Sequence, residues 1–323
     1  FQEQNPGCSF KILTKEKSNC TLNKKVYGWH PYWGGTTYNN YRWNLLSHLC
    51  YFSYELNPNT GLPDTLNYWL TSDAVDSALS HGIKVNLCVT LFANHSTFLN
   101  DTVAKNNCID TLIQLIKNRG AHGVNIDFEG MSASNTSAFS TFIMDLSNRF
   151  HSEIPGSEVS IDIHAVEWTN VFDETTLKQY VDYFIIMGYD FYWSGSTVAG
   201  PVDPLYNFEI TYNYTLTKSI TSNLNQGIEP SKLLLGLPYY GRQWKTADSI
   251  VPSSTTATGT TKTFKTVKTN TSGYYSDKHW NVASFTPYYP FQSGGFWYQC
   301  WINDAYSMGK RFDMINQRGI GGI

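Results

Sequence analysis

The sequence predicts an α/β fold, a closed (β/α)8 TIM barrel, and three observations support this prediction. Short apolar segments alternate with stretches of helical periodicity along the chain, as expected for repeated βα units around a parallel sheet. The apolar segments are continuous rather than alternating, which is typical of strands buried on both faces. The length of 323 residues suits one barrel with insertions.

The strands and helices can be assigned in order from these patterns. Apolar segments predict eight barrel strands, at residues 26–29, 49–54, 84–91, 123–128, 159–165, 183–189, 232–237 and 319–323. Helices are expected between them, most clearly at 101–119, 136–150 and 303–317, where apolar residues recur at helical spacing. The first of these helices is expected to end at Gly120, since glycine commonly follows the last helical turn.

Two segments interrupt the alternation of strands and helices. Residues 1–25 form a polar N-terminal extension, and the barrel is expected to span 26–323. Residues 242–298, after the seventh strand, are rich in Thr, Ser, Gly and Tyr, and this segment is too long for a plain βα loop. We therefore expect an inserted subregion of short strands on the upper face of the barrel, where it could form a cleft wall.

Composition and charge exclude several classes of protein. The formal net charge of -3 provides no basic field for a phosphate backbone, so no nucleic-acid partner is expected. No stretch approaches 18 consecutive apolar residues, so no membrane span is expected, and we expect a monomer. The chain contains 22 Tyr, 18 Phe and 10 Trp, which could fill a large core or stack against sugar rings.

The six cysteines favour an exported protein over a metal protein. They show no zinc-ligand spacing, so we expect neither metal nor cofactor, and their even number in a Thr- and Asn-rich chain favours secretion. Cys8 and Cys20 are expected to form a disulfide that closes a loop, whereas Cys88 is expected to be a buried thiol. Because the chain begins with Phe1 rather than Met, we expect a leader to precede it.

The fourth predicted strand contains the candidate catalytic residues. It is followed directly by Glu129, and strand alternation places Asn125, Asp127 and Glu129 on one face, toward the barrel axis. Each such group costs roughly 1–3 kcal/mol if buried without a partner, so a column of three indicates mutual bonding or a ligand. Partial burial and the carboxylate of Asp127 would let Glu129 hold a proton near neutral pH and act as a general acid.

Two other interpretations of this column stay open. The two carboxylates could be a solvated pair in a loop without any catalytic role. The Asn125, Asp127 and Glu129 side chains could also hold Mg²⁺ or Ca²⁺ in a metal-dependent hydrolase. Such a metal site would need further ligands at neighbouring strand ends, where Asp162 and His164 of the fifth strand are the candidates.

Four segments together resemble one enzyme family, glycoside hydrolase family 18, the chitinase family. The fourth strand resembles its D-G-x-D-x-D-x-E signature, with His122 and Asn125 in place of the first two acidic residues. Other segments follow in the family's order: Tyr27-Gly28-Trp29 in the first strand, Met187-Gly188-Tyr189-Asp190 in the sixth, Gly236-Leu237-Pro238-Tyr239-Tyr240-Gly241-Arg242 in the seventh, and Gly319-Ile320-Gly321-Gly322-Ile323 in the eighth.

The resemblance implies a retaining mechanism in which the substrate supplies the nucleophile. It implies that Glu129 protonates the glycosidic oxygen, that Asp127 accepts the N–H of the sugar's acetamido group, and that Tyr189 binds the acetamido oxygen. Asn125, Asp190 and Met187 are expected to support these residues. Residues expected to bind substrate are Tyr27, Trp33, Trp193, Tyr239 and Arg242, although pairing of Arg242 with an acidic residue of the insertion is an alternative.

The implied partner is a polysaccharide or oligosaccharide that contains N-acetylglucosamine, with β-1,4-linked chitin first. Peptidoglycan and the chitobiose core of N-glycans are alternatives, because both carry the acetamido group that this mechanism uses. A non-catalytic, chitinase-like sugar-binding protein is the remaining alternative. Such proteins usually lose the acid that matches Glu129, so its presence favours catalysis.

The chain departs from the family pattern at three places. Asn125 replaces an acidic residue; we expect a shifted pH profile, and the resulting N-x-D-x-E form is similar to family branches that act on cell-wall fragments. The S-x-G-G pattern of the third strand is absent from residues 84–92. The sequence ends at Ile323, before the family's tryptophan beyond the eighth strand, so the resemblance implies that the natural protein continues.

Overall fold

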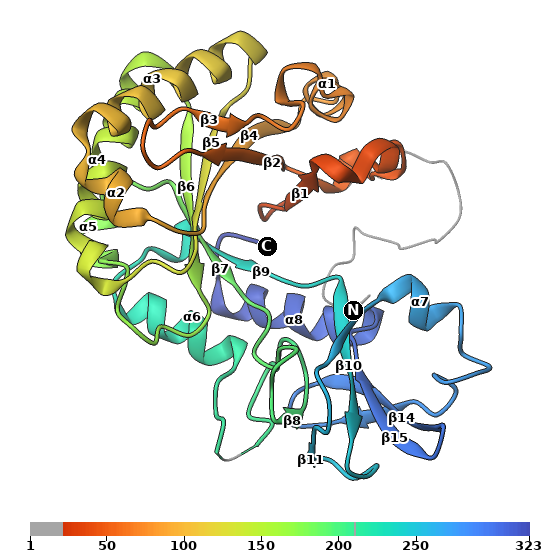
Figure 1. The fold of residues 1–323 in the computed structure, drawn as a ribbon. Coiled ribbons are helices and arrows are strands. Elements are labelled where there is room, and N and C mark those ends of the chain that lie inside the picture. Colours follow the sequence, from red (N-terminus) through yellow and green to blue (C-terminus); the bar gives the residue numbers. More distant parts are fainter. Residues whose placement is uncertain (1–21, 210) are drawn as a thin grey trace.

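A parallel sheet curls into the barrel that the sequence predicts. The computed structural model describes residues 22–209 and 211–323 (Figure 1). Seven strands pair in parallel in the order β1-β2-β4-β5-β6-β7-β9, and the short β3 (Pro63–Thr65) pairs antiparallel with β2. The seven are β1 (Tyr27–Pro31), β2 (His48–Leu56), β4 (Lys84–Leu91), β5 (Gly123–Phe128), β6 (Glu158–His164), β7 (Tyr183–Met187) and β9 (Leu233–Gly236).

A short segment, residues 321–323, closes the barrel in the place of an eighth strand. Gly322 forms parallel bridges to both Lys25 and Leu234, so it joins the two open edges of the sheet. The backbone N–H of Tyr27 donates to the carbonyl of Ile323 at 2.8 Å, on the β1 side. The sequence predicts this strand from Gly319 onward, but Gly319 has a φ of 68° and ends the preceding helix, so the strand is shorter than expected.

Helices cover the outer face of the sheet (Figure 1). The longer ones pack their apolar faces against the strands and form one continuous core with them. These helices are α1 (Asp73–Ser80), α2 (His95–Asn100), α3 (Thr102–Arg119), α4 (Thr136–Glu153), α5 (Glu174–Leu177), α6 (Leu216–Asn225) and α8 (Ala305–Arg318), with 3-10 turns at Tyr32–Asn40, Trp43–Leu45, Trp69–Thr71, Ala133–Asn135 and Pro230–Lys232. The short α7 (Phe264–Lys268) lies instead in the smaller lobe. Helices α3, α4 and α8 confirm the three helices predicted from periodicity.

Helix α3 illustrates how the sequence sets these boundaries. The carboxylate of Asp101 accepts hydrogen bonds from the backbone N–H groups of Val103 and Ala104 and so caps the first turn. Gly120 ends the helix with a φ of 62°, a conformation that glycine adopts without steric cost. Between the two caps the buried residues recur at helical spacing: Ala104, Cys108, Ile109, Leu112, Ile113, Leu115 and Ile116.

A second, antiparallel sheet lies between β9 and α8. Its strands pair in the order β12-β10-β15-β14-β13, and it forms the smaller lobe of Figure 1. The bounds are β10 (Tyr240–Thr246), β12 (Thr260–Thr263), β13 (His279–Asn281), β14 (Thr286–Ser293) and β15 (Phe296–Trp301), while β8 (Val198–Ala199) pairs with β11 (Ser253–Ser254). The segment 242–298 therefore contains short strands, joined by loops and by α7, around a small core of its own, which includes Val267, Tyr275 and Tyr289.

A buried ion pair ties this sheet to the barrel. Arg311 of α8 donates from Nε to Oδ2 of Asp203 at 2.6 Å, and both side chains are almost completely inaccessible to water. The same guanidinium donates to the hydroxyl of Thr286 at 2.9 Å, at the start of β14. Asn303, which follows β15, donates to both carboxylate oxygens of Asp203 at 2.8 Å. Both oxygens of the Asp203 carboxylate thus accept hydrogen bonds, as a buried charge requires.

Two details of β7 and of the cysteines differ from, or extend, the sequence prediction. β7 ends at Met187 rather than at residue 189, because the backbone N–H groups of Gly188 and Tyr189 turn back to the carbonyls of Ile186 and Met187, at 2.8 Å each. Position 188 accommodates only glycine, since a Cβ atom there would lie 2.4 Å from the carbonyl oxygen of Gly236. The expected buried thiol of Cys88 is confirmed, and the other cysteines within the described ranges are also free and buried: Cys50, Cys108 and Cys300. The disulfide expected between Cys8 and Cys20 lies outside the described residues. Within those ranges, no helix is both long and apolar enough to cross a membrane.

Candidate active site

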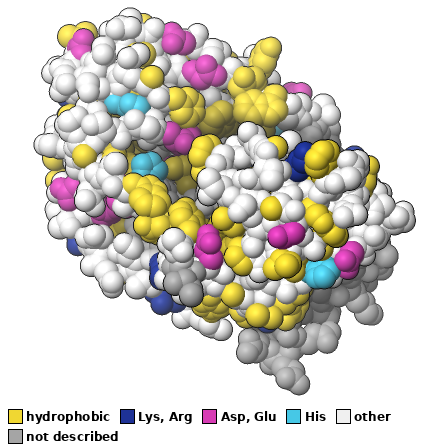
Figure 2. Space-filling model, turned by 60° about the horizontal axis from the view of Figure 1, so that its bottom comes forward, with side chains coloured by type: hydrophobic (Ala, Val, Ile, Leu, Met, Phe, Trp, Pro, Cys, Tyr) yellow, Lys and Arg dark blue, Asp and Glu magenta, His cyan; other side chains and the backbone are white. Residues whose placement is uncertain are grey.

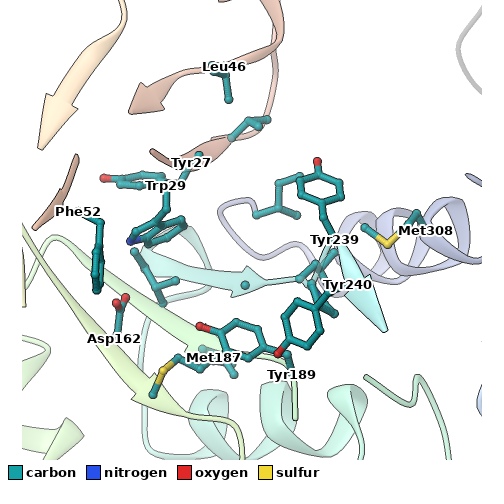
Figure 3. Close-up of a pocket in the computed structure, with 18 of the residues that line it drawn as sticks. Tyr27, Trp29, Leu46, Phe52, Asp162, Met187, Tyr189, Tyr239, Tyr240 and Met308 are labelled. Atoms are coloured by element: carbon teal, nitrogen blue, oxygen red, sulfur yellow. The ribbon is translucent and has the colours of Figure 1, made fainter. Parts of the chain in front are cut away.

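A large cavity opens at the carboxyl ends of the barrel strands, where this fold carries its functional residues. Its volume is about 770 Å³, and its lining includes Trp29, Asp127, Asp162, Glu129 and Tyr189. Figure 3 shows Trp29, Asp162 and Tyr189 pointing into this space from β1, β6 and the end of β7. Side chains that lie far apart in the sequence therefore meet in one cavity.

Asn125 lies at the bottom of the polar column on β5 and is completely buried. Its side-chain amide donates to Oδ1 of Asp162 at 3.0 Å and to the hydroxyl of Ser160 at 3.2 Å. Its carbonyl oxygen accepts from the indole N–H of Trp29 at 3.4 Å. The sequence suggests a bond from Asn125 to Asp127, but these contacts direct the amide to β6 instead.

Asp127 is buried beside this network without joining it. Its exposed fraction is 7%, and its Oδ1 atom has no hydrogen-bond partner among the described residues. Burial, followed by the negative charge of Glu129, raises the pKa of the Asp127 carboxyl to about 7. Asp127 is therefore an unpaired acceptor that faces the cavity and takes up a proton near neutral pH.

Asp162 is a second buried carboxyl in the same cavity. Burial and the charge of Asp127 raise its pKa well above the ordinary value, while the hydrogen bond from Asn125 acts in the opposite direction. The sequence suggests Asp162 only as a possible metal ligand. The signal that would have placed it in the site is the alternation on β6, where Ser160, Asp162 and His164 share one face.

Glu129 lies one residue beyond the end of β5, at the mouth of the cavity. Its side chain is exposed, which differs from the partial burial that the sequence suggests, because the strand has ended and no neighbouring loop covers it. A second, smaller cavity of about 280 Å³ also has Glu129 in its wall, together with Met187 and Tyr189. Glu129 therefore contacts both spaces.

Tyr189 follows β7 and separates the two cavities together with Met187. Burial of its hydroxyl and the charges of Asp162 and Asp127 raise the pKa of Tyr189 well above its usual value. The phenol therefore stays protonated, so it can donate a hydrogen bond to a ligand in the larger cavity. Met187 is half-buried and forms part of the same wall.

Asp190 and Arg242 form a salt bridge with each other. The guanidinium of Arg242 donates to Oδ2 of Asp190 at 2.8 Å and to Oδ1 at 2.9 Å, and the hydroxyl of Tyr240 donates to the same Oδ1 at 2.9 Å. Asp190 has a φ of 56°, which turns the chain sharply after Tyr189. The expected pairing of Arg242 with an acidic residue is present, but the partner follows β7 instead of lying in the insertion.

The remaining aromatic candidates occupy different surroundings. Tyr27 is buried low in the barrel, where its ring stacks on His48 with 4.1 Å between the ring centroids, and it lines the larger cavity from below. Tyr239 is 82% exposed at the rim of that cavity. Trp33 and Trp193 are exposed but line neither cavity. Residues 22–209 and 211–323 contain no group of three or more His, Cys, Asp or Glu residues that could hold a metal ion.

Comparison with known proteins gives one family and several relatives. The family model for glycosyl hydrolases family 18 matches residues 25–323. A Bacillus subtilis protein named as the sporulation-specific glycosylase YdhD is 22% identical over 84% of this chain and 63% of its own length. The cortical fragment-lytic enzyme of Bacillus anthracis is 22% identical over 86% and 64%, and mouse di-N-acetylchitobiase 26% over 65% and 62%. The chain thus spans less than two thirds of these curated relatives.

Solved structures share the fold across most of the chain. The Ostrinia furnacalis Group IV chitinase superimposes with a TM-score of 0.82 at 20% identity, covering 93% of this chain and 92% of that one. The class V chitinase of Nicotiana tobaccum, solved as a mutant with NAG4, gives a TM-score of 0.81 at 18% identity, with coverages of 93% and 92%. At these identities the likeness shows the barrel architecture.

Proposed function

This chain belongs to glycosyl hydrolase family 18, a family of glycosidases, and from that premise we propose that it cleaves β-1,4-linked N-acetylglucosamine polymers of the chitin type with retention of configuration. The observation that carries the proposal is the state of Asp127, a buried carboxyl with an unpartnered oxygen beside Glu129 and Tyr189. An acetamido N–H of a sugar in the larger cavity would supply the missing donor.

In the proposed first step, Glu129 donates a proton to the glycosidic oxygen as the bond from that oxygen to the anomeric carbon breaks. The acetamido carbonyl oxygen of the substrate attacks the same carbon and closes a cyclic oxazolinium ion. Asp127 accepts the acetamido N–H and stabilises the positive charge that develops on this ring. Tyr189, which stays protonated, donates to the acetamido oxygen and holds it in line for attack.

In the second step the leaving sugar has departed and Glu129 is a carboxylate. It takes a proton from an incoming water molecule, whose oxygen attacks the anomeric carbon and reopens the oxazolinium ring. The acetamido group is regenerated, and the product keeps its original configuration at the anomeric carbon. The substrate must therefore carry a 2-acetamido group, so we expect cellulose and starch to be inert.

The test is cleavage of chitooligosaccharides, purified peptidoglycan and a high-mannose glycopeptide by the wild type and by Glu129→Gln. The variant keeps the shape of the side chain but cannot donate the proton, so we expect a loss of about 10²-fold or more in turnover. Asp145→Asn, on the exposed face of α4, is the matched control and should retain full activity. Equal activity of Glu129→Gln and the wild type would refute the acid role.

Peptidoglycan is a second candidate substrate. The relatives named as a sporulation-specific glycosylase and a cortical fragment-lytic enzyme, both from Bacillus, favour testing the bacterial cell wall. Its glycan strands carry the acetamido group that the proposed mechanism requires. Release of reducing ends from purified peptidoglycan, but not from chitooligosaccharides, would favour this candidate. We further propose that the protein is exported, because both polymers are found outside the cytoplasm.

A further inference from the structure

Four hydrogen bonds saturate the side chain of Asn125, at the bottom of the polar column on β5. Its amide nitrogen donates to Oδ1 of Asp162 at 3.0 Å and to the hydroxyl of Ser160 at 3.2 Å. Its carbonyl oxygen accepts from the indole N–H of Trp29 at 3.4 Å and from the thiol of Cys50 at 3.6 Å. Each end of a side-chain amide makes two such bonds, so Asn125 has none left for a further partner.

Two members of this network fix the orientation of the amide. An indole has an N–H donor but no acceptor, so the atom of Asn125 that faces Trp29 must be the carbonyl oxygen. On the other side, the hydroxyl of Ser160 donates its proton to the backbone carbonyl of Val124 at 3.4 Å, so it can only accept from Asn125. The amide therefore cannot turn over without losing hydrogen bonds at both ends.

The neighbouring carboxyl of Asp127 lacks the donor that Asn125 gives to Asp162. Asp127 lies two residues further along the same face of β5, it is buried, and its Oδ1 atom has no hydrogen-bond partner among the described residues. Figure 2 shows hydrophobic side chains gathered along a hollow of the molecular surface, with acidic side chains among them. A buried acceptor without a donor costs free energy, and rotation of the Asn125 amide toward Asp127 would remove that cost.

We infer that Trp29 is a positioning residue, whose indole N–H holds the Asn125 amide in place and thereby keeps Asp127 free for the acetamido N–H of a substrate. This inference rests on the proposed function, which assigns that acceptor role to Asp127. The chain of bonds runs across the barrel interior from β1 through β5 to β6. Figure 3 shows its two ends, Trp29 and Asp162, pointing into the same space.

The test variant is Trp29→Phe, which keeps an aromatic ring in the cavity wall but removes the N–H donor. Without that donor the Asn125 amide can rotate and donate to Asp127, which favours the ionised carboxyl. Because Asp127 acts as an anion in the proposed mechanism, kcat/KM for N-acetylglucosamine hexamer should rise about one pH unit lower than in the wild type. Its highest value should fall about tenfold, since Asn125 then competes with the substrate for Asp127.

The titratable groups that interact with the charge of Asp127 all remain in this variant. They are Glu129 beyond the end of the same strand, Cys50 of β2, Cys88 of β4, Asp162 of β6 and Tyr189 after β7. A shift of the pH profile therefore reports the loss of the indole donor. NMR titration of the Asp127 carboxyl, identified by its absence in Asp127→Asn, measures the same effect without substrate, and the pKa of Asp127 should be lower in Trp29→Phe.

An Asn125→Ala background separates positioning from direct contact with the substrate. Because Trp29 acts through Asn125, adding Trp29→Phe in that background should change neither kcat/KM nor its pH profile. An equal change in both backgrounds would show that the Trp29 ring itself contacts the substrate, and would overturn the inference. Trp280→Phe, on β13 of the small sheet, is the matched control and should keep wild-type kinetics, since Trp280 lines neither cavity.

The failure of the proposed function and the failure of this inference give different results. No cleavage of the hexamer by the wild type would refute the proposed function. Cleavage by the wild type, with the same rates, pH profile and Asp127 titration in Trp29→Phe, would refute the inference alone. A rise of kcat/KM at higher pH in Trp29→Phe, or a higher pKa of Asp127, would also overturn the inference.

Discussion

The side-chain amide of Asn125 donates a 3.0 Å hydrogen bond to Asp162, and this bond directs the amide away from Asp127. Three carboxyl groups, those of Asp127, Asp162 and Glu129, therefore line one cavity with a single amide among them. Like charges in a cavity of low polarity cannot all ionise at neutral pH. We therefore expect the three carboxyl groups to keep at least one proton at neutral pH. The loss of that proton should affect both activity and stability, as the predictions below describe.

The first prediction concerns the pH profile of Asn125→Asp. Because the pKa of Asp127 is about 7 and its anion is what stabilises the oxazolinium charge in the proposed mechanism, we expect the wild-type kcat/KM to rise as pH increases through about 7. A carboxyl at position 125 would repel the ionised form of Asp127 and raise the pKa of Asp127 further, so this rise should move to higher pH in the variant. Initial rates on a chitooligosaccharide from pH 4 to 9 provide the measurement, and a rise that moves to lower pH would contradict the prediction.

The second prediction concerns Asp162→Asn. Burial and the charge of Asp127 raise the pKa of Asp162 well above its ordinary value, so its surroundings favour the neutral carboxyl, and an amide of the same shape carries the same charge as that form. We expect kcat at pH 6 to 7 to stay within about tenfold of the wild type. A loss of several hundredfold there would show that Asp162 acts as an anion.

The third prediction concerns Asp127→Asn, which should lose turnover and gain stability. The pKa of Asp127 is raised from 3.8 to about 7, so the folded protein loses stability as pH rises between these values. The asparagine side chain cannot ionise, so this loss disappears in the variant: we expect a gain of up to about 4 kcal/mol in the free energy of unfolding at pH 8, and none near pH 3.

Turnover of Asp127→Asn should fall strongly while substrate binding persists, because the role of Asp127 grows with the charge of the transition state. Denaturant unfolding at both pH values tests the first part, and kcat with a binding isotherm tests the second.

The fourth prediction concerns a buried acid at the opposite end of the barrel. Glu158 begins β6, lies 3.0 Å from Nε2 of His48, and accepts hydrogen bonds from Lys84 and Tyr183. Burial would raise its pKa, but the contacts with His48 and Lys84 outweigh burial and lower it to about 2. The stabilisation is therefore complete above about pH 4.5 and is lost as pH falls toward 2.

Glu158→Gln should consequently lower the free energy of unfolding at pH 7 by roughly 3 kcal/mol, the cost of breaking a buried ion pair. The difference should shrink as pH falls from about 4.5 toward 2. Glu153→Gln, at the C-terminal end of α4, is the control and should leave the free energy of unfolding nearly unchanged, because its ion pair with Arg149 is open to water. Equal stability of Glu158→Gln and the wild type at pH 7 would contradict the role of this cluster.

The fifth prediction concerns the pair formed by Arg242 and Asp190. Arg242 lies on β10 and Asp190 follows β7, so the pair holds the insertion against the wall that separates the two cavities. In Arg242→Gln the carboxylate loses its partner, and we expect KM to rise several-fold more than kcat falls. Lys265→Gln, on α7, is the control. Steady-state kinetics on N-acetylglucosamine hexamer provides the test, and a KM equal to that of the wild type would contradict the prediction.

The barrel itself could be predicted because its strands are continuous apolar segments whose burial leaves little choice of structure. Strand ends were harder to place, since they depend on contacts between distant residues. β7 ends where the backbone turns at Gly188, a position that must be glycine because the carbonyl of Gly236 lies so close, and no local pattern reports that contact. Likewise, Gly319 was expected to begin the eighth strand, but its left-handed backbone conformation makes it the last residue of the turn that ends α8.

The polar column could be predicted because a single strand carries it. Alternation along 123–129 places Asn125 and Asp127 on one face of β5; in the structure both side chains are buried, Asp127 lines the larger cavity, and Asn125 is bonded to Asp162. The sequence could not pair Asn125 with Asp162, because their contact depends on the register between β5 and β6. Nor could it single out Trp168 among ten tryptophans, since its place in the wall of the smaller cavity depends on how the loop after β6 folds.

The pair of Asp203 and Arg311 has a further consequence for catalytic turnover. Swinging the small sheet outward would pull Thr286 and Asn303 away from this pair and leave two charges that no water reaches short of hydrogen bonds, at a cost of several kcal/mol. Hinged closure, which sets the pace of many enzymes, is therefore disfavoured here. For the proposed glycosidase, release of the products from the cavity, rather than the opening of a gate, should therefore limit turnover.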